Sequence, residues 1–135
     1  MKMKLFVVLL SVFCFTSLAV NISSLTLAQA QQSSTTADEQ QIIRVALQVN
    51  SSSPGIAPAR VDKVAISSPY ALASVVFGEG DGMVVLAKKQ GTWQAIGGGG
   101  GWLVSTELEE LGIPRQTAQL LLQRIDPNWK NYESH

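Results

Sequence analysis

The chain has 135 residues, with 10 Lys and Arg balanced by 10 Asp and Glu, a single His and a single Cys. This length accommodates one domain. Only 11 glycines and 15% charged residues exclude the collagen-like and the highly charged disordered classes of protein. A formal charge of zero argues against a nucleic-acid partner, because binding to phosphates depends on clustered Lys and Arg.

The first thirty residues have the three parts of a secretory signal peptide. Two lysines stand among the first four residues, an apolar run follows, and Ala28-Gln29-Ala30 matches the small-residue cleavage site. We therefore predict a signal peptide over residues 1–30 and a periplasmic or secreted mature protein with no stable membrane span. The alternative is an uncleaved anchor, because residues 5–27 are nearly long enough to cross a bilayer.

Removal of this segment would change the chemistry that the chain can perform. It takes away Cys14, the only cysteine, so the mature protein would have no disulfide, thiolate metal ligand or thiol nucleophile. It also takes away two lysines and leaves a slightly acidic protein. Such an exported domain has to be held together by its apolar core.

The mature chain is expected to open with a flexible stretch and a helix. Residues 31–36 are rich in Gln, Ser and Thr, which is typical of a flexible lead-in. Thr36 and Glu39 then have the spacing of a capping box at the start of a helix. Apolar residues follow at helical spacing and predict an amphipathic helix over residues 37–49, namely Ile42, Ile43, Ala46 and Val49.

Apolar and β-branched segments separated by turn residues come next. They predict three or four strands, over residues 61–67, 70–77, 83–88 and 92–96. The turns between them are too short for parallel crossovers, so the strands are expected to form an antiparallel meander. In the first strand, the alternation places Val61 on the same face as Lys63 and Ala65.

Two short helices are expected after the strands. Thr106 and Glu109 have the capping-box spacing, and the helix that they open should end near Gly112. Pro114 suits the first turn of a second helix, which Asp126-Pro127 would stop.

The order of these elements predicts the fold class α+β. It comprises an N-terminal helix, an antiparallel meander of three to four strands, and two short C-terminal helices packed on one face of the sheet. A single domain is expected over residues 37–128, followed by a tail over residues 129–135.

Few residues of the mature chain could perform catalysis. The only histidine, His135, is the last residue, so a Ser-His-Asp arrangement has no base unless the tail folds back. Glu79 and Asp81 could act as paired carboxylates or bind a hard cation. Their glycine-rich surroundings are more typical of a solvated turn, and two carboxylates are too few for a calcium site. We therefore expect no enzyme activity, no cofactor and no bound metal.

The glycine run Gly97 to Gly101 has two interpretations. Glycine-rich backbone before a helix can cradle an anion, but the acidic segment from Glu107 to Glu110 would repel phosphate. A flexible connector is therefore favoured. Trp93 is expected in the core, whereas Trp102 fits either the core or a recognition groove. The residues expected to form an interaction surface are Glu79, Asp81, Gly98, Gly99 and Trp102.

The stretch from Tyr70 to Leu122 carries a pattern of five segments. These are Tyr70-Ala71-Leu72-Ala73, Gly78-Glu79-Gly80-Asp81-Gly82, Val84-Val85-Leu86-Ala87-Lys88-Lys89, Gly91-Thr92-Trp93 and Leu108-Glu109-Glu110-Leu111-Gly112-Ile113-Pro114. The pattern resembles a family of small exported bacterial proteins described as copper-uptake-system associated. That description implies a genomic neighbourhood more than an activity.

One feature of the resemblance bears on copper. The family often has a cysteine in the loop after the tryptophan-bearing strand, whereas the corresponding segment here, Gly97 to Gly101, has no sulfur. The mature chain then keeps only Met83 and His135 as soft or imidazole ligands, so one mature chain is not expected to bind copper.

Three functions follow from these observations. The favoured hypothesis is a non-enzymatic exported accessory or interaction domain of the bacterial envelope, with an envelope protein of unknown identity as partner and a monomeric or weakly dimeric state. The alternative that the resemblance implies is a periplasmic copper-handling protein. The third is an enzyme that uses Glu79 and Asp81 on a saccharide of the envelope.

Overall fold

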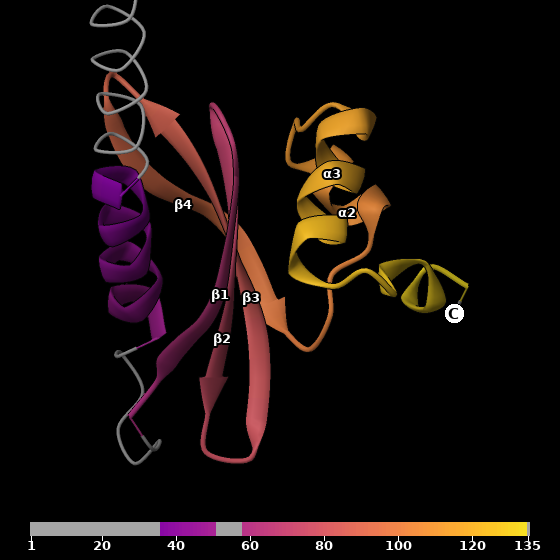
Figure 1. Ribbon diagram of the computed structural model, residues 1–135, viewed down its shortest axis with the longest axis horizontal. Coiled ribbons are helices and arrows are strands. Elements are labelled where there is room, and N and C mark those ends of the chain that lie inside the picture. The colour runs from indigo at the N-terminus through magenta and orange to yellow at the C-terminus, as the bar shows by residue number, and fades with distance from the viewer. Residues whose placement is uncertain (1–35, 51–57, 135) are drawn as a thin grey trace, which may run out of the picture. The chain divides into compact units, whose positions relative to one another are not determined.

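The computed structural model describes residues 36–50 and 58–134 (Figure 1). The predicted signal peptide with Cys14, most of the lead-in, and His135 lie outside these residues. Residues 36–50 are helical. The elements that follow are β1 (Arg60–Ser67), β2 (Tyr70–Phe77), β3 (Gly80–Lys89), β4 (Thr92–Gly100), α2 (Ser105–Glu110), α3 (Arg115–Ile125) and a 3-10 helix, η1 (Trp129–Tyr132).

The four strands form one antiparallel sheet in the order β1-β2-β3-β4. Two-residue turns join consecutive strands, at Ser68-Pro69, Gly78-Glu79 and Gln90-Gly91. The second turn has a φ of 61° at Gly78, and the third has φ angles of 52° and 78° at its two residues. Positive φ angles give hairpin turns whose twist matches that of the paired strands. The predicted antiparallel meander is therefore confirmed, with four strands.

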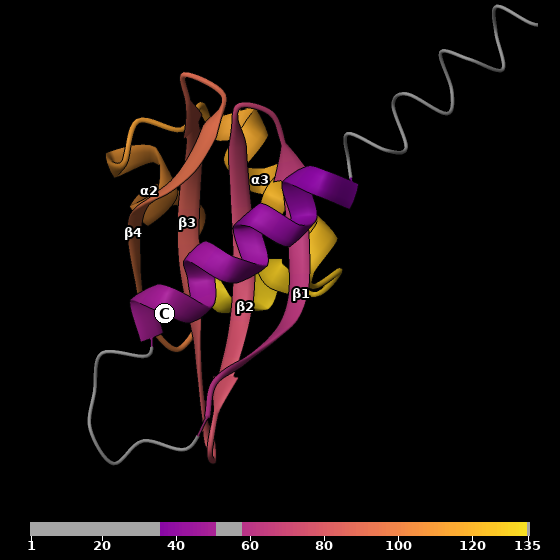
Figure 2. The same cartoon turned by 90° about the vertical axis from the view of Figure 1, so that its left-hand side faces the viewer.

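Helices cover both faces of this sheet (Figures 1 and 2). The helix of residues 36–50 lies across one face, and α2 and α3 pack on the other. The predicted α+β class and the placement of the C-terminal helices on one face are confirmed. Because the sheet is covered on both sides, β2 and β3 consist of nearly continuous apolar residues instead of a strict alternation.

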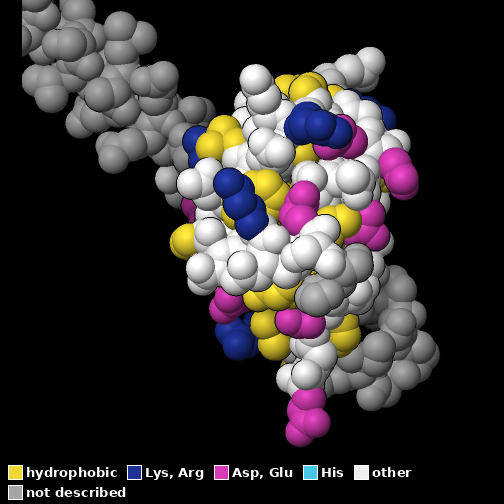
Figure 3. Space-filling view, turned by 90° about the vertical axis from the view of Figure 1, so that its right-hand side faces the viewer, with side chains coloured by type: hydrophobic (Ala, Val, Ile, Leu, Met, Phe, Trp, Pro, Cys, Tyr) yellow, Lys and Arg dark blue, Asp and Glu magenta, His cyan; other side chains and the backbone are white. Residues whose placement is uncertain are grey.

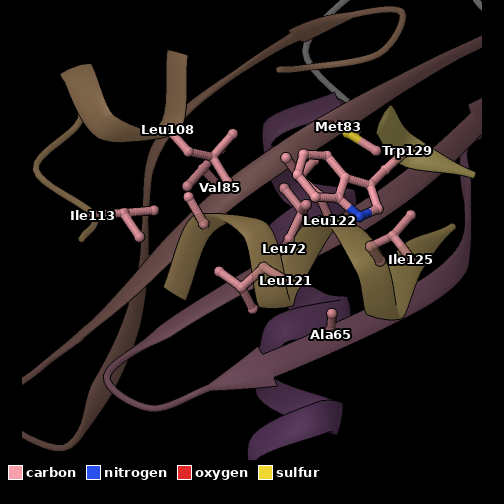
Figure 4. Close-up of a cluster of buried hydrophobic side chains, with 11 residues drawn as sticks. Ala65, Leu72, Met83, Val85, Leu108, Ile113, Leu121, Leu122, Ile125 and Trp129 are labelled. Atoms are coloured by element: carbon pink, nitrogen blue, oxygen red, sulfur yellow. The ribbon is translucent and has the colours of Figure 1, made fainter. Parts of the chain in front are cut away.

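The face under α2 and α3 holds the larger apolar cluster (Figure 4). In α3 the buried residues recur at helical spacing, at Ala118, Leu121, Leu122 and Ile125, which gives the helix one apolar stripe. The stripe packs on sheet residues such as Leu72 and Val85. On the outer surface of this side, acidic and basic side chains are scattered among apolar ones and form no large patch of one sign (Figure 3).

The opposite face packs against the helix of residues 36–50 through a second cluster. Ile42 and Ala46 stand one turn apart in this helix and are fully buried. In the same cluster, Ala71 and Ala73 of β2 carry small side chains that leave room for the helix to approach the sheet. Trp93 of β4, only 2% exposed, also belongs to it, as the sequence predicted.

The predicted face of Val61 is wrong. The register of β1 against β2 shifts between Val61 and Lys63, so Asp62 is the extra residue of a β-bulge. A one-residue insertion reverses the alternation of faces along a strand. Val61 therefore packs with Val64 and Ile66, on the side of the first helix.

The start of α2 differs from the predicted capping box. The helix begins at Ser105, and the Val104 N–H donates to Glu107 Oε2 at 2.9 Å. The Ser105 N–H donates to Glu133 Oε1 at 2.6 Å. A carboxylate from the C-terminal segment thus accepts a hydrogen bond from a free N–H at the start of the helix, the role predicted for the side chain of Thr106. Local spacing could not reveal this contact, because Glu133 is distant in the sequence.

The predicted tail contains residues that belong to the core. Its first residues form η1, and Trp129 is only 6% exposed within the larger apolar cluster. Tyr132 stacks on the ring of Trp102. The packed part of the domain therefore extends beyond residue 128, because an apolar residue of this size buries area that the small core needs.

Candidate interaction site

Four of the five residues predicted for the interaction surface lie at one end of the sheet. Glu79 is exposed in the turn between β2 and β3, and Asp81 is the second residue of β3. Gly98 and Gly99 are exposed in β4, which pairs with β3. The Gly101 N–H, just beyond β4, donates to the Asp81 carbonyl at 3.0 Å and holds the end of the two strands together.

The fifth residue, Trp102, lies in the segment between β4 and α2. Its ring is stacked on that of Tyr132, with 4.8 Å between the ring centroids and 6° between the planes. Trp102 is partly buried and packs against the larger apolar cluster, while Tyr132 is 36% exposed. The structure thus gives Trp102 a packing role on the α2–α3 face.

The glycine run forms a strand, so the predicted flexible connector is wrong over residues 97–100. These residues are the second half of β4 and pair with Gly82 to Val85 of β3. A ladder is made by backbone groups, so glycine can extend it wherever a neighbouring strand offers partners. The register shifts beside Ile96, which is the extra residue of a bulge between the two halves of β4.

A hollow of about 290 Å³ lies beside this glycine strand. Apolar side chains and glycine backbone form most of its walls, and Asn50 adds a polar residue; the lining residues are Val49, Asn50, Phe77, Met83, Val84 and Gly97 to Gly100. Val49, near the end of the first helix, is 52% exposed. The hollow therefore places an accessible apolar wall next to unshielded backbone.

None of the non-glycine residues that line the hollow was predicted for the interaction surface, namely Val49, Asn50, Phe77, Met83 and Val84. Val49, Asn50 and Phe77 come from the end of the first helix and the end of β2, segments that are distant in the chain from the glycine run. The helical spacing placed Val49 on the apolar face of the helix, but spacing cannot show whether a residue of that face is buried by the sheet or exposed beside it. Their convergence is a property of the tertiary structure.

The outer edge of β4 offers free hydrogen-bonding groups at two glycines. The Gly101 N–H points inward to β3, and inward and outward residues alternate along an antiparallel edge strand. Gly97 and Gly99 therefore pair inward, whereas the N–H and C=O groups of Gly98 and Gly100 point away from β3. Among the described residues, no strand pairs with this outer edge.

Only some of the glycines in β4 occupy positions that another residue could not fill. A Cβ on Gly97 would lie 2.6 Å from Leu111 Cδ1, and a Cβ on Gly98 would lie 2.5 Å from the Met83 carbonyl oxygen. Among the described residues, by contrast, no atom would lie within 4 Å of a Cβ on Gly99 or Gly100, and neither glycine has a positive φ angle. Glycine in a strand interior is destabilising, and no contact within the described residues requires glycine at these two positions.

The two edges of the sheet differ in their protection. At the β1 edge, Arg60, Asp62 and Lys63 supply charges, and Asp62 also forms a bulge. Charges and bulges are the devices by which natural edge strands avoid pairing with other chains. β4 has the sequence TWQAIGGGG, with no charged residue and no proline, so the glycine end of this edge is left open to pairing.

An ion pair lies at the other end of the sheet from the glycines. Lys88 Nζ lies 2.9 and 3.1 Å from the two carboxylate oxygens of Asp38, which ties the first helix to β3. The hydrogen bond from Lys88 lowers the pKa of Asp38 below its ordinary value of 3.8, against a smaller opposing effect of burial. The buried indole N–H of Trp93 makes no hydrogen bond, although it lies near enough to this carboxylate to lower the pKa further.

This lowered pKa predicts a specific dependence of stability on pH. A carboxyl whose pKa is depressed on folding stabilises the protein above its unfolded pKa, and that contribution is lost as the pH falls through the folded pKa. We expect Asp38→Asn to lower the free energy of unfolding by about 0.5 kcal/mol at neutral pH, a value discounted for partial exposure. In urea titrations, the difference from wild type should shrink as the pH falls below 3.8 and vanish only when the carboxyl of the folded protein is protonated. Glu39→Gln, at an exposed neighbouring position, is the control and should show a smaller difference.

Two kinds of feature are absent from the described residues. Within residues 36–50 and 58–134, no three His, Cys, Asp or Glu side chains gather in a way that could hold a metal ion. None of the helices in this part of the chain combines the length and the apolar character that a membrane crossing requires.

No protein-family model, no curated protein and no solved structure matches this chain. The resemblance to copper-uptake-associated proteins therefore stays a prediction.

Proposed function

We propose that this chain is a non-enzymatic interaction domain that binds its partner by adding an extended strand to the edge of β4. The observation that carries the proposal is the unprotected glycine end of this edge, where Gly98 and Gly100 direct their N–H and C=O groups outward. Strand addition to an exposed edge is a recurrent mode of peptide recognition, in which main-chain hydrogen bonds supply affinity. The neighbouring hollow supplies a place for a side chain.

The free groups are sufficient for a weak, specific contact. Two outward-facing residues offer two donors and two acceptors, and each hydrogen bond contributes about 0.5–1.5 kcal/mol net. Gly99 and Gly100 also have open space beside them, since a Cβ on either residue would meet no atom of the described residues within 4 Å. The export that residues 1–30 predict would place this domain in the bacterial envelope, which makes an envelope protein the proposed partner.

Selection from a displayed library of linear peptides, about twelve residues long, tests this function. We expect the protein to enrich binders, and Gly100→Pro to bind the enriched peptides about ten-fold more weakly or worse. Proline removes the outward N–H of residue 100 and leaves the pairing with β3 intact, as expected for an edge position. Binding is measured by fluorescence polarisation and folding by circular dichroism.

Gly100→Ala is the matched control, since it keeps the N–H and its Cβ meets nothing within 4 Å. It should bind within about three-fold of wild type, since the hydrogen bonds are retained. Amide hydrogen exchange gives an independent measurement: an enriched peptide should slow exchange at Gly98 and Gly100 and leave the inward-facing Gly99 unchanged. Failure to enrich any peptide, or equal binding by folded Gly100→Pro, would contradict the proposal.

A further inference from the structure

We infer that the captured strand carries one large apolar side chain with Lys or Arg beside it, an inference that rests on the proposed strand addition at β4. The juxtaposition that supports it is an apolar hollow and two exposed carboxylates at the same end of the sheet. The partner is therefore defined by its chemistry as a basic and apolar extended segment of another protein.

The hollow lies on the face where a paired strand would place a side chain. By register, Gly98 and Gly100 lie opposite Val84 and Gly82, on the face that packs against the first helix. A residue of an added strand that pairs with either glycine projects its side chain to the same face, because faces alternate along paired strands. Here it meets the walls formed by Val49 and the aromatic ring of β2.

The size and composition of the hollow favour a single apolar side chain. Its volume of about 290 Å³ lies at the lower limit of the roughly 300–1,000 Å³ found for small-molecule pockets. Val49 leaves half of its surface exposed, although Phe77 and Val84 beside it are partly or fully buried. A leucine-sized or phenylalanine-sized side chain would cover this wall and remove apolar surface from water.

The charges at this end of the sheet select for a basic neighbour. Glu79 and Asp81 are both exposed, and within the described residues neither forms an ion pair. Asp81 is joined through its backbone to Gly101, directly beyond the two outward-facing glycines. The basic residues Lys88 and Lys89 lie at the far end of β3. A Lys or Arg near the Gly100 end would therefore be attracted and an acidic residue repelled.

A second copy of this chain fits the same edge less well. If β4 of one copy paired with β4 of another, the glycine half would lie opposite either glycines or the segment Thr92 to Ala95. The one large residue of that segment, Trp93, is buried in its own core. Such a pairing leaves the hollow without a large apolar occupant, whereas a separate peptide can supply one.

Three labelled synthetic peptides test the inference by fluorescence polarisation against the purified full chain. The parent peptide is Thr-Thr-Lys-Leu-Lys-Thr-Thr, whose symmetry allows either strand direction. Its Lys side chains project to the face opposite that of Leu, which is the face of Asp81 by register. We expect replacement of its Leu by Gly to weaken binding about ten-fold, and replacement of both Lys by Glu to weaken it about five-fold. The double variant Glu79→Gln, Asp81→Asn should abolish the preference for Lys over Glu, whereas Glu39→Gln, at the opposite end of the sheet, should retain it.

The outcomes separate this inference from the proposed function. If all three peptides bind equally, or if only unrelated library peptides bind, the inferred chemistry is wrong while strand addition at β4 stands. If no peptide of any sequence binds, the proposed function fails as well. If sedimentation shows a dimer that Gly100→Pro dissociates, the occupant of the edge is a second copy and the inference is overturned.

Discussion

Replacement of Trp129 by alanine is expected to lower the free energy of unfolding by about 3–4 kcal/mol, the range for a large buried aromatic residue. The side chain is only 6% exposed and packs among Met83, Leu122 and Ile125 in the larger apolar cluster (Figure 4). Truncation leaves a cavity between α3 and the sheet that the rigid strands cannot close. Small domains are stable by about 5–15 kcal/mol, so this change is a large fraction of the total.

Urea titration of the full chain, followed by circular dichroism, measures this difference. Lys130→Ala is the matched control, because Lys130 is exposed and its Nζ only approaches the Trp129 ring, 5.8 Å from the centroid. That variant should lose less than about 1 kcal/mol, as for an exposed cation–π contact. A loss below about 1 kcal/mol in Trp129→Ala would show that residues beyond 128 contribute no more than a tail.

The regular elements of this fold could be predicted because their local signals agree with the tertiary structure. The stripe of α3 is periodic, so Leu121 and Leu122 could be assigned to the core from spacing alone. Turn residues such as Gln90-Gly91 indicated where one strand ends and the next begins. Turns this short allow only antiparallel pairing of the strands that they join. It could not be predicted that helices cover both faces of the sheet, because the apolar sequence of a strand does not identify the helix that packs against it.

The misassigned parts depend on partners that are distant in the chain. Gly97 to Gly100 has no strand propensity, yet it is a strand because β3 extends far enough to pair with it. Asp62 forms a bulge that no local pattern marks, and the bulge moves Val61 to the other face. Glu133 reaches the start of α2 from the C-terminal segment. In each case a tertiary contact overrides the local preference.

The candidate site shows the same division between local and tertiary information. The glycine run, Glu79 and Asp81 were recognisable by composition, and the structure brings them to one end of the sheet. The hollow was not recognisable, because Val49 and Phe77 come from elements that meet only after folding. Composition therefore identified the residues of the candidate surface, and the structure added the open strand edge on which the proposed binding mode depends.

A single methyl group at Gly98 is expected to lower the free energy of unfolding by about 2–3 kcal/mol, the range for local strain and overpacking. Its Cβ would lie 2.5 Å from the carbonyl oxygen of Met83, a backbone atom that cannot move without breaking the β3–β4 ladder. Gly98 also has a φ of 154°, an angle that residues with a Cβ rarely adopt. Both effects require glycine for the fold itself, whatever binds at the edge.

Gly99→Ala is the control that makes this prediction specific to one position. Its Cβ meets no atom within 4 Å and its φ is not positive, so the variant should be neutral or more stable by about 0.5 kcal/mol through reduced entropy of the unfolded chain. Thermal unfolding of the two variants should therefore shift in opposite directions or by clearly unequal amounts. Equal losses would contradict the prediction, because they would mean that Gly98 needs to be glycine no more than Gly99 does.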